Sequence, residues 1–108
     1  MAKATFIQSG DNIDYTPASD TEYMEIVPLT DRIGIALENI AKSETGTVTL
    51  TGVFELPAAT GSALTVGQKV YFDKSKNQIT ATAEGNIYAG YTVAPKAAAA
   101  ASARVRIG

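Results

Sequence analysis

The feature that most restricts the fold of this chain is an alternation of apolar and polar side chains that recurs in five segments. Successive side chains of a strand point to opposite faces, so this period is typical of a strand with one buried face. Turn-forming residues separate the segments at 43–46, 61–62, 73–77 and 84–86. The segments are "DRIGIALEN" (31–39), "TVTLTGVFEL" (47–56), "QKVYFD" (68–73), "NIYAGYTV" (86–93) and "ARVRIG" (103–108). Short strands at this spacing predict an all-β fold, a small single-domain β-barrel or β-sandwich.

The same alternation predicts which side chains face the core. Gly52 interrupts its segment, and glycine weakens a strand interior, so a bulge or a sharp bend is expected there. The predicted inward positions are Ile33, Ile35, Leu37, Val48, Leu50, Phe54, Leu56, Val70, Phe72, Ile87, Ala89, Tyr91, Val93, Val105 and Ile107.

The beginning of the chain is less regular. Residues 1–22 are interpreted as an N-terminal arm or as first strands, ahead of a compact β-domain over 23–108. Strands are expected around 4–8, 12–16 and 23–28. Either all three complete the domain's own sheet, or the first part is an arm that buries its apolar residues on a neighbour. In the second case the candidate intersubunit or capsid contacts are Phe6, Ile7, Ile13 and Tyr15.

The segment "PKAAAAASA" (95–103) contains the strongest helix formers of the chain. It is shorter than the roughly 12 residues that a free helix needs in water. We therefore expect an alanine-rich loop before the last strand, with at most one helical turn. A second short helix is considered near Ala63–Val66.

The composition removes several kinds of chemistry. The chain of 108 residues has no Cys and no His, which excludes disulfides, thiolate catalysis and the usual zinc sites. Residues 1–60 carry a net charge of −6 and residues 61–108 carry +4. These are either scattered solvated charges or a polarity that helps copies dock. The bases are few and unclustered, so no nucleic-acid partner is expected.

The start of the chain and its hydropathy predict neither a signal peptide nor a membrane span. No apolar run approaches the roughly 18 residues of a membrane span, so no membrane partner is expected. The start "MAKATFIQSGD" lacks the apolar region of a signal peptide. Synthesis in the cytoplasm is the expectation.

The stretch "TGSALTVGQKV" (60–70) resembles a phosphate-binding loop only superficially. Such a loop needs four residues between its first glycine and a Gly-Lys-Ser/Thr triplet. Here five residues separate Gly61 from Gly67, Gln68 precedes Lys69, and Val70 stands where the hydroxyl belongs. A strand pattern follows instead of a helix, so no nucleotide site is predicted.

The remaining polar residues predict no active site. Asp11, Asp14, Asp20, Glu22 and Glu25 have no EF-hand spacing, and neither a metal nor any other cofactor is expected. No nucleophile–base–orienter set is evident, so the chain is not expected to be an enzyme. Three tyrosines are interpreted as core and rim packing rather than as a base-stacking surface: Tyr71, Tyr88 and Tyr91.

Over nearly its whole length the sequence resembles the capsid decoration (cement) proteins of tailed bacteriophages, a family once catalogued as a domain of unknown function. The resemblance rests on the order of "FIQSGDNIDYT", "VTLTGVFELPAATGSALTVGQKVYFD", "GNIYAGYTV" and "ARVRIG". "GVFELP" and "GQKVYFD" are its most specific parts. There is no catalytic motif to transfer.

The resemblance implies a structural virion protein that binds the outside of an assembled head and stabilises it against internal DNA pressure. Its partners would be the major capsid protein and further copies of itself, commonly as a homotrimer. Its location would be the capsid exterior, after synthesis in the host bacterial cytoplasm. Two other hypotheses are kept: a surface carbohydrate- or ligand-binding β-module, which needs a groove with aromatic residues, and a small hydrolase, which needs clustered carboxylates.

Overall fold

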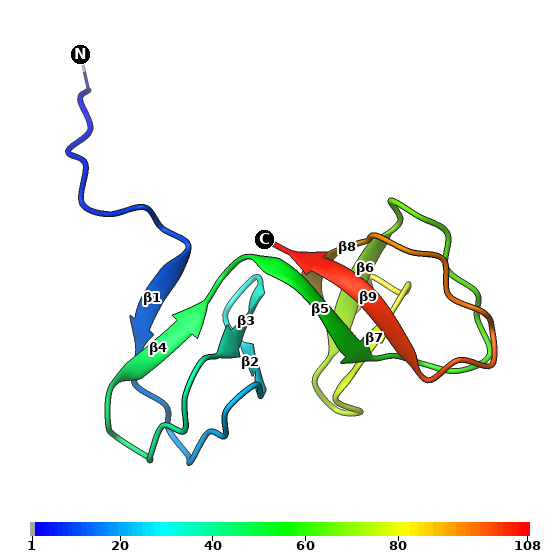
Figure 1. The fold of residues 1–108 in the computed structure, drawn as a ribbon, viewed down its shortest axis with the longest axis horizontal. Coiled ribbons are helices and arrows are strands. Elements are labelled where there is room, and N and C mark those ends of the chain that lie inside the picture. The colour runs from blue at the N-terminus through cyan, green and yellow to red at the C-terminus, as the bar shows by residue number, and fades with distance from the viewer. Residues whose placement is uncertain (1) are drawn as a thin grey trace.

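The computed structural model describes residues 2–108, which form nine strands in two antiparallel sheets and no helix (Figure 1). The predicted all-β fold is therefore confirmed. The strands are β1 (Asn12–Tyr15), β2 (Ile26–Pro28), β3 (Ile33–Ala36), β4 (Gly46–Thr49), β5 (Gly52–Pro57), β6 (Lys69–Asp73), β7 (Gln78–Thr80), β8 (Ile87–Thr92) and β9 (Ser102–Ile107).

The N-terminal sheet has the strand order β1-β4-β3-β2, with β1 and β2 at its edges. Its strand β3 is buried on both faces. One face presents Ile33 and Ile35 to the main core. The other face presents Ala36, which packs with Val27 and Val48 in a second cluster. Alternation predicts that Ala36 faces solvent. This prediction is wrong because both faces of the sheet are covered at β3.

The C-terminal sheet has the strand order β5-β9-β8-β6-β7 and curls until its edge strands approach each other. A single parallel bridge joins Ala58 to Ile79, and the Ala59 N–H donates to the Ile79 carbonyl at 2.8 Å. The two edges are not otherwise paired, so the arrangement is sandwich-like and not a closed barrel.

The two sheets share one core. Ile33 and Ile35 of β3 belong to the same buried cluster as the inner residues of the C-terminal sheet, which include Val70, Phe72 and Val105. The chain crosses from one sheet to the other between Thr49 and Gly52. Gly52 has φ 132°, so the expected bend is confirmed, and "TVTLTGVFEL" forms two strands in different sheets.

The predicted inward set is correct along β6 and β9, where Val70, Phe72, Val105 and Ile107 are buried. It is wrong for Leu37, which follows the end of β3 and is 38% exposed. Leu50, in the link between the two sheets, and Phe54, near the start of β5, are only half-buried, although Phe54 packs against the main core.

A β-bulge explains why the predicted alternation of inward and outward side chains fails in β8. Val70 pairs with Gly90 and Tyr71 with Tyr88, so Ala89 is an extra residue on β8. The extra residue shifts the alternation by one position. Tyr91, predicted as inward, is therefore 38% exposed, whereas Thr92 is 1% exposed.

Several predicted elements differ in extent. Residues 4–8 form no strand, the strand expected at 23–28 begins at Ile26, and no helix forms at 63–66. Strand β7 was not predicted. The alanine-rich loop forms no helix but contains a hydrogen-bonded turn, in which the Ala100 N–H donates to the Ala97 carbonyl at 3.0 Å. Its Lys96 is 5% exposed and donates from Nζ to the carbonyls of Ser62 at 2.8 Å and Ala97 at 3.1 Å.

Residues 2–10 extend away from both sheets (Figure 1), whereas the Asp11 carbonyl already accepts from the Leu50 N–H at 2.7 Å. The Cα radius of gyration is 14.9 Å, against about 13 Å for a compact chain of this length. The extended segment, residues 2–10, contributes to this difference, and we call it the arm.

Candidate interaction surfaces

The loop before β6 has no free phosphate-binding geometry. The Gly61 N–H donates to Ala98, the Gly67 N–H to Thr92 and the Leu64 N–H to Lys96, all through backbone carbonyls at 2.7–3.0 Å. The donors that would hold a phosphate are thus used within the fold. Lys69 begins a strand and not a helix.

The carboxylates are spread over turns. Among residues 2–108 no group of three or more Asp or Glu side chains gathers at a metal-binding distance. Asp20 Oδ1 accepts from the Lys42 N–H at 2.8 Å. Asp73 accepts from the Ser75 hydroxyl at 2.6 Å, and this hydrogen bond lowers the pKa of the Asp73 carboxyl below its ordinary 3.8. These carboxylates therefore stabilise turns. The same range contains no apolar helix of membrane-spanning length.

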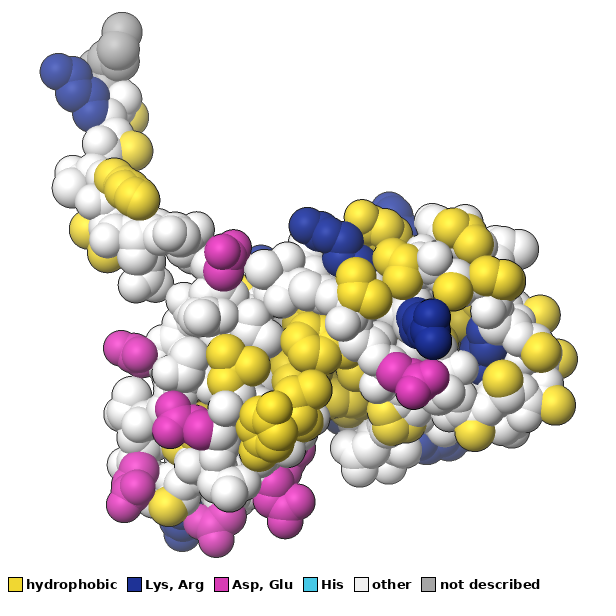
Figure 2. All heavy atoms as spheres, in the orientation of Figure 1, with side chains coloured by type: hydrophobic (Ala, Val, Ile, Leu, Met, Phe, Trp, Pro, Cys, Tyr) yellow, Lys and Arg dark blue, Asp and Glu magenta, His cyan; other side chains and the backbone are white. Residues whose placement is uncertain are grey.

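The arm presents two adjacent large apolar side chains to solvent. Phe6 is 76% exposed and Ile7 is 82% exposed. Gln8 Nε2 donates to the Asn12 carbonyl at 3.3 Å, close to the point where the arm meets β1. Figure 2 shows the arm standing clear of the remaining molecule. Contiguous exposed apolar residues in a soluble chain are typical of a contact surface.

The other two predicted contact residues lie in a different environment. Ile13 and Tyr15 are in β1, which pairs with β4 of the same chain. Both are half-buried against the second cluster, which includes Val48. The structure therefore divides the four candidates into a solvent-exposed pair on the arm and a pair that packs within its own sheet.

A groove of about 420 Å³ lies where the two sheets meet. Ile26 of β2, Pro57 of β5 and Phe72 of β6 contribute apolar surface to it. Its lining residues are Met24, Glu25, Ile26, Pro57, Phe72 and Asn77. The one aromatic residue among them is Phe72, which is 2% exposed, so the groove lacks the aromatic platform expected of a carbohydrate-binding module.

Met24 at this groove has an unusual backbone conformation, with φ 68°. Residues other than Gly, Asn and Asp are rare in this left-handed backbone region, and adopting it costs them about 1 kcal/mol or more. The turn is maintained by the Met24 N–H, which donates to the Ala36 carbonyl at 2.7 Å, and by the Tyr23 N–H, which donates to Asn39 Oδ1 at 2.8 Å. The result is two exposed apolar side chains, with Tyr23 62% and Met24 45% exposed. The sequence did not predict this turn, because Tyr23 and Met24 fall at the start of the strand expected at 23–28.

Charge is divided between the two sheets. Acidic side chains dominate the surface of the N-terminal sheet, and several Lys and Arg side chains lie on the C-terminal sheet (Figure 2). On the outer face of the latter, the Arg106 guanidinium lies 5.9 Å from the ring centre of Tyr91. Tyr71 and Tyr88 form an edge-to-face pair with ring centres 5.9 Å apart.

Comparison with known proteins identifies the family. The profile of a family described as phage cement protein matches residues 7–107, so Phe6 lies just outside the match and Ile7 is its first residue. Searches of the curated proteins and of the solved structures found no match to the chain. A match over nearly the whole sequence, on an all-β fold, is consistent with the structural role of that class. The chain therefore belongs to the phage cement protein family, whose members have a capsid-binding structural role in the virion.

Proposed function

We propose that this protein binds the outer surface of an assembled phage head, contacts the major capsid protein and stabilises the shell against internal DNA pressure. The family match over residues 7–107 carries the proposal. The hydrogen bonding of the loop at 61–68 and the use of acids in turns also support a mechanical rather than a catalytic role.

Stabilisation would follow from mass action. A protein that binds the mature shell and not its disrupted form shifts the equilibrium toward the mature shell. One site contributes about 2.7 kcal/mol when the free protein is at about 100 times its Kd. Many sites on one head would add their contributions, so a modest affinity per site is sufficient.

The arm is the proposed contact element. Phe6 and Ile7 are exposed, and burial of apolar area contributes about 25 cal/mol per Å². Ile13 and Tyr15 would support the arm by anchoring β1 to the N-terminal sheet. We propose that residues 1–16 contribute to contacts between subunits or with the shell, and that the copies act as a homotrimer. The proposed location is the capsid exterior, after synthesis in the host bacterial cytoplasm.

Reconstitution tests the proposal directly. Purified chain is added to mature heads assembled without it, and bound protein is measured by co-sedimentation while DNA release is followed on heating. We expect saturable binding and a higher temperature of DNA release. Absence of binding would refute the function, and saturable binding without a change in DNA release would refute the stabilising role.

A matched truncation tests the arm in the same assay. A chain without residues 2–9 should bind heads weakly or not at all, because it lacks Phe6 and Ile7. Unchanged binding by this truncated chain would show that the arm is not the contact element.

A further inference from the structure

We propose that the groove between the two sheets receives the Phe6–Ile7 segment of a second copy of this chain. The proposal rests on the arm's role as a contact element and names its receptor. It follows from three observations: the arm and the groove lie at opposite edges of the N-terminal sheet, the groove has a suitable size and apolar side chains for the arm, and the charges around the two are complementary.

The first observation is that arm and groove lie at opposite edges of one sheet. The arm leaves the N-terminal sheet at edge strand β1, whereas the groove adjoins edge strand β2 (Figure 1). Three strand spacings, about 14 Å in total, separate those edges. The arm also runs away from the body of its own chain. A neighbouring copy can therefore receive it without any folding back across the sheet.

The second observation is the match between the two surfaces. The groove volume of about 420 Å³ is within the range of roughly 300–1,000 Å³ typical of sites that bury a ligand. Met24 projects at its edge from a strained turn, and a methionine side chain adapts readily to an incoming apolar group. Phe6 and Ile7 are the most exposed large apolar residues of the described chain.

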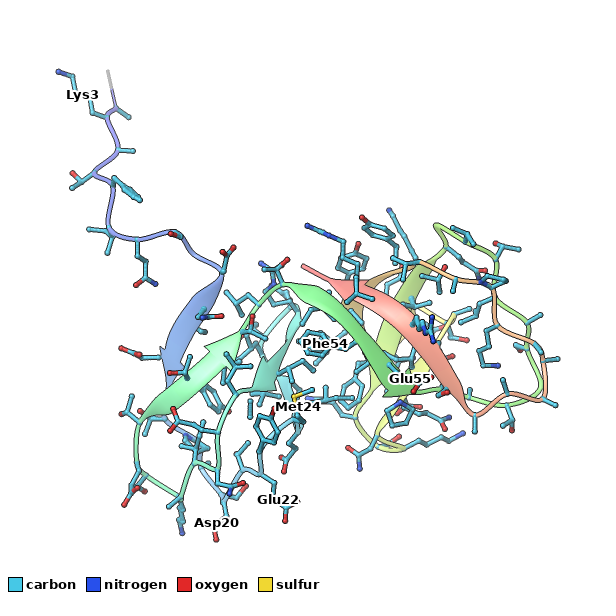
Figure 3. The ribbon with its side chains drawn as sticks, in the orientation of Figure 1. Lys3, Asp20, Glu22, Met24, Phe54 and Glu55 are labelled. Carbon is cyan, nitrogen blue, oxygen red and sulfur yellow. The ribbon has the colours of Figure 1, made fainter. Side chains whose placement is uncertain are left out.

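The third observation is charge complementarity. Residues 2–10 carry Lys3 and no acid, whereas the loop at 20–25, which leads into the groove, carries three acids and no base. Of these acids Glu25 lines the groove. Figure 3 shows Asp20 and Glu22 farther along the same loop, below Met24 at the lower end of the N-terminal sheet, and Lys3 near the tip of the arm. Opposite charges around an apolar contact orient the partners and select the register. An arm of one copy in the groove of the next is a heterologous contact, which closes into a ring when the rotation permits.

Cysteine cross-linking tests the contact, because the chain has no Cys of its own. Thr5→Cys places a thiol beside Phe6 and leaves both apolar residues intact. Asn77→Cys places the second thiol in the groove lining. An affinity-tagged Thr5→Cys chain is mixed with an untagged Asn77→Cys chain under mild oxidation. We expect a disulfide-linked heterodimer, because a disulfide forms only when the Cα atoms come within about 7 Å.

Matched controls separate docking from random collision. Ala99→Cys is exposed in the alanine-rich loop, away from the groove, and should give little heterodimer with Thr5→Cys. Adding Phe6→Ser and Ile7→Ser to the Thr5→Cys chain should lower the heterodimer yield by roughly tenfold or more, because anchor side chains carry most of a contact's free energy. Met24→Asn, which tolerates the positive φ, should lower the yield as well. If Asn77→Cys does not fold, Glu25→Cys takes its place.

Three results would overturn the inference. They are a yield equal to that of the Ala99→Cys control, a yield insensitive to the Phe6 and Ile7 substitutions, and a doubly substituted Thr5→Cys/Asn77→Cys chain that closes only an internal disulfide. The last result would assign the groove to the chain's own arm. Head binding is measured on the same variants. If the protein binds heads but no cross-link forms, the groove contact alone is rejected. If the cross-link forms but the protein does not bind heads, the proposed function alone is rejected.

Discussion

Gly90 allows β8 to lie against β9 at the bulge. Its φ is 150°, and a Cβ built on it would lie 2.0 Å from the Arg106 carbonyl oxygen. That oxygen belongs to the backbone of β9 and cannot move without breaking the strand pairing at Gly90–Ile107. Glycine is therefore required here by close packing of the backbone as well as by conformation.

Gly90→Ala should destabilise the protein by roughly 3 kcal/mol or more, since it combines backbone strain with a severe steric clash. Urea denaturation measures the change in free energy of unfolding. Gly85→Ala is the matched control, because Gly85 has φ 75° but no atom within 4 Å of the added Cβ. It should cost only about 1–2 kcal/mol. Equal losses for the two variants would contradict the steric explanation.

Lys96 illustrates a buried charge satisfied by backbone carbonyls. Its Nζ joins the alanine-rich loop to the loop at 58–64 through the Ser62 carbonyl, at 2.8 Å. Lys96→Met keeps the length and apolar stem but leaves these carbonyls without their donor. We expect a loss of about 1–3 kcal/mol in the free energy of unfolding. Lys69→Met, at an exposed position, should change the free energy of unfolding by less than about 0.5 kcal/mol. A similar loss in the Lys69 and Lys96 variants would argue against a stabilising role of the hydrogen bonds from Lys96 Nζ to backbone carbonyls.

At the scale of elements, the arm and β1 have different roles although they are adjacent in sequence. β1 pairs with β4 through four residue pairs, and its Ile13 and Tyr15 pack on the second cluster. The arm before it has no strand pairing.

Two deletions should separate these roles. Deletion of residues 2–9 should leave the melting temperature nearly unchanged, because it removes exposed side chains. Deletion of residues 2–16 should lower it by several degrees at least, since a loss of about 1 kcal/mol shifts the Tm of a chain this size by roughly 4–8 °C. Differential scanning calorimetry provides the measurement. Equal melting temperatures would mean that β1 is dispensable for the sheet.

At the scale of the whole molecule, the shared core should make the two sheets unfold together. Ile33 and Ile35 of the N-terminal sheet lie in one cluster with residues of β5, β6, β7, β8 and β9. The linker at 50–51 is too short to let the sheets separate without exposing that cluster.

Ile35→Ala, at a position 1% exposed, should therefore lower the free energy of unfolding by about 2–5 kcal/mol, and both sheets should be destabilised equally. Amide hydrogen exchange in β4 and in β8 should report the same loss, and the unfolding transitions should coincide. If only the N-terminal sheet lost protection, the two sheets would be independent folding units.

The amino-acid sequence by itself determined the fold class and most of the C-terminal sheet. Alternation along β6 and β9 is regular because each strand has one buried face, so Val70, Phe72, Val105 and Ile107 were placed correctly. The local chemistry of glycine predicted the bend at Gly52. The spacing around Gly61 and Lys69 departs from that of a phosphate-binding loop, and Phe6 and Ile7 became contact candidates through their apolar character ahead of the patterned region; both remain predictions.

Only the tertiary structure decided the rest. Burial on both faces of β3, the phase shift in β8 and the half-burial of Phe54 depend on which element covers which face, and a period of two contains no such information. The groove could not be predicted for the same reason: it is formed by Met24 and Ile26 from one sheet and Pro57 and Phe72 from the other. These residues are far apart in sequence, and the shared hydrophobic core brings them together.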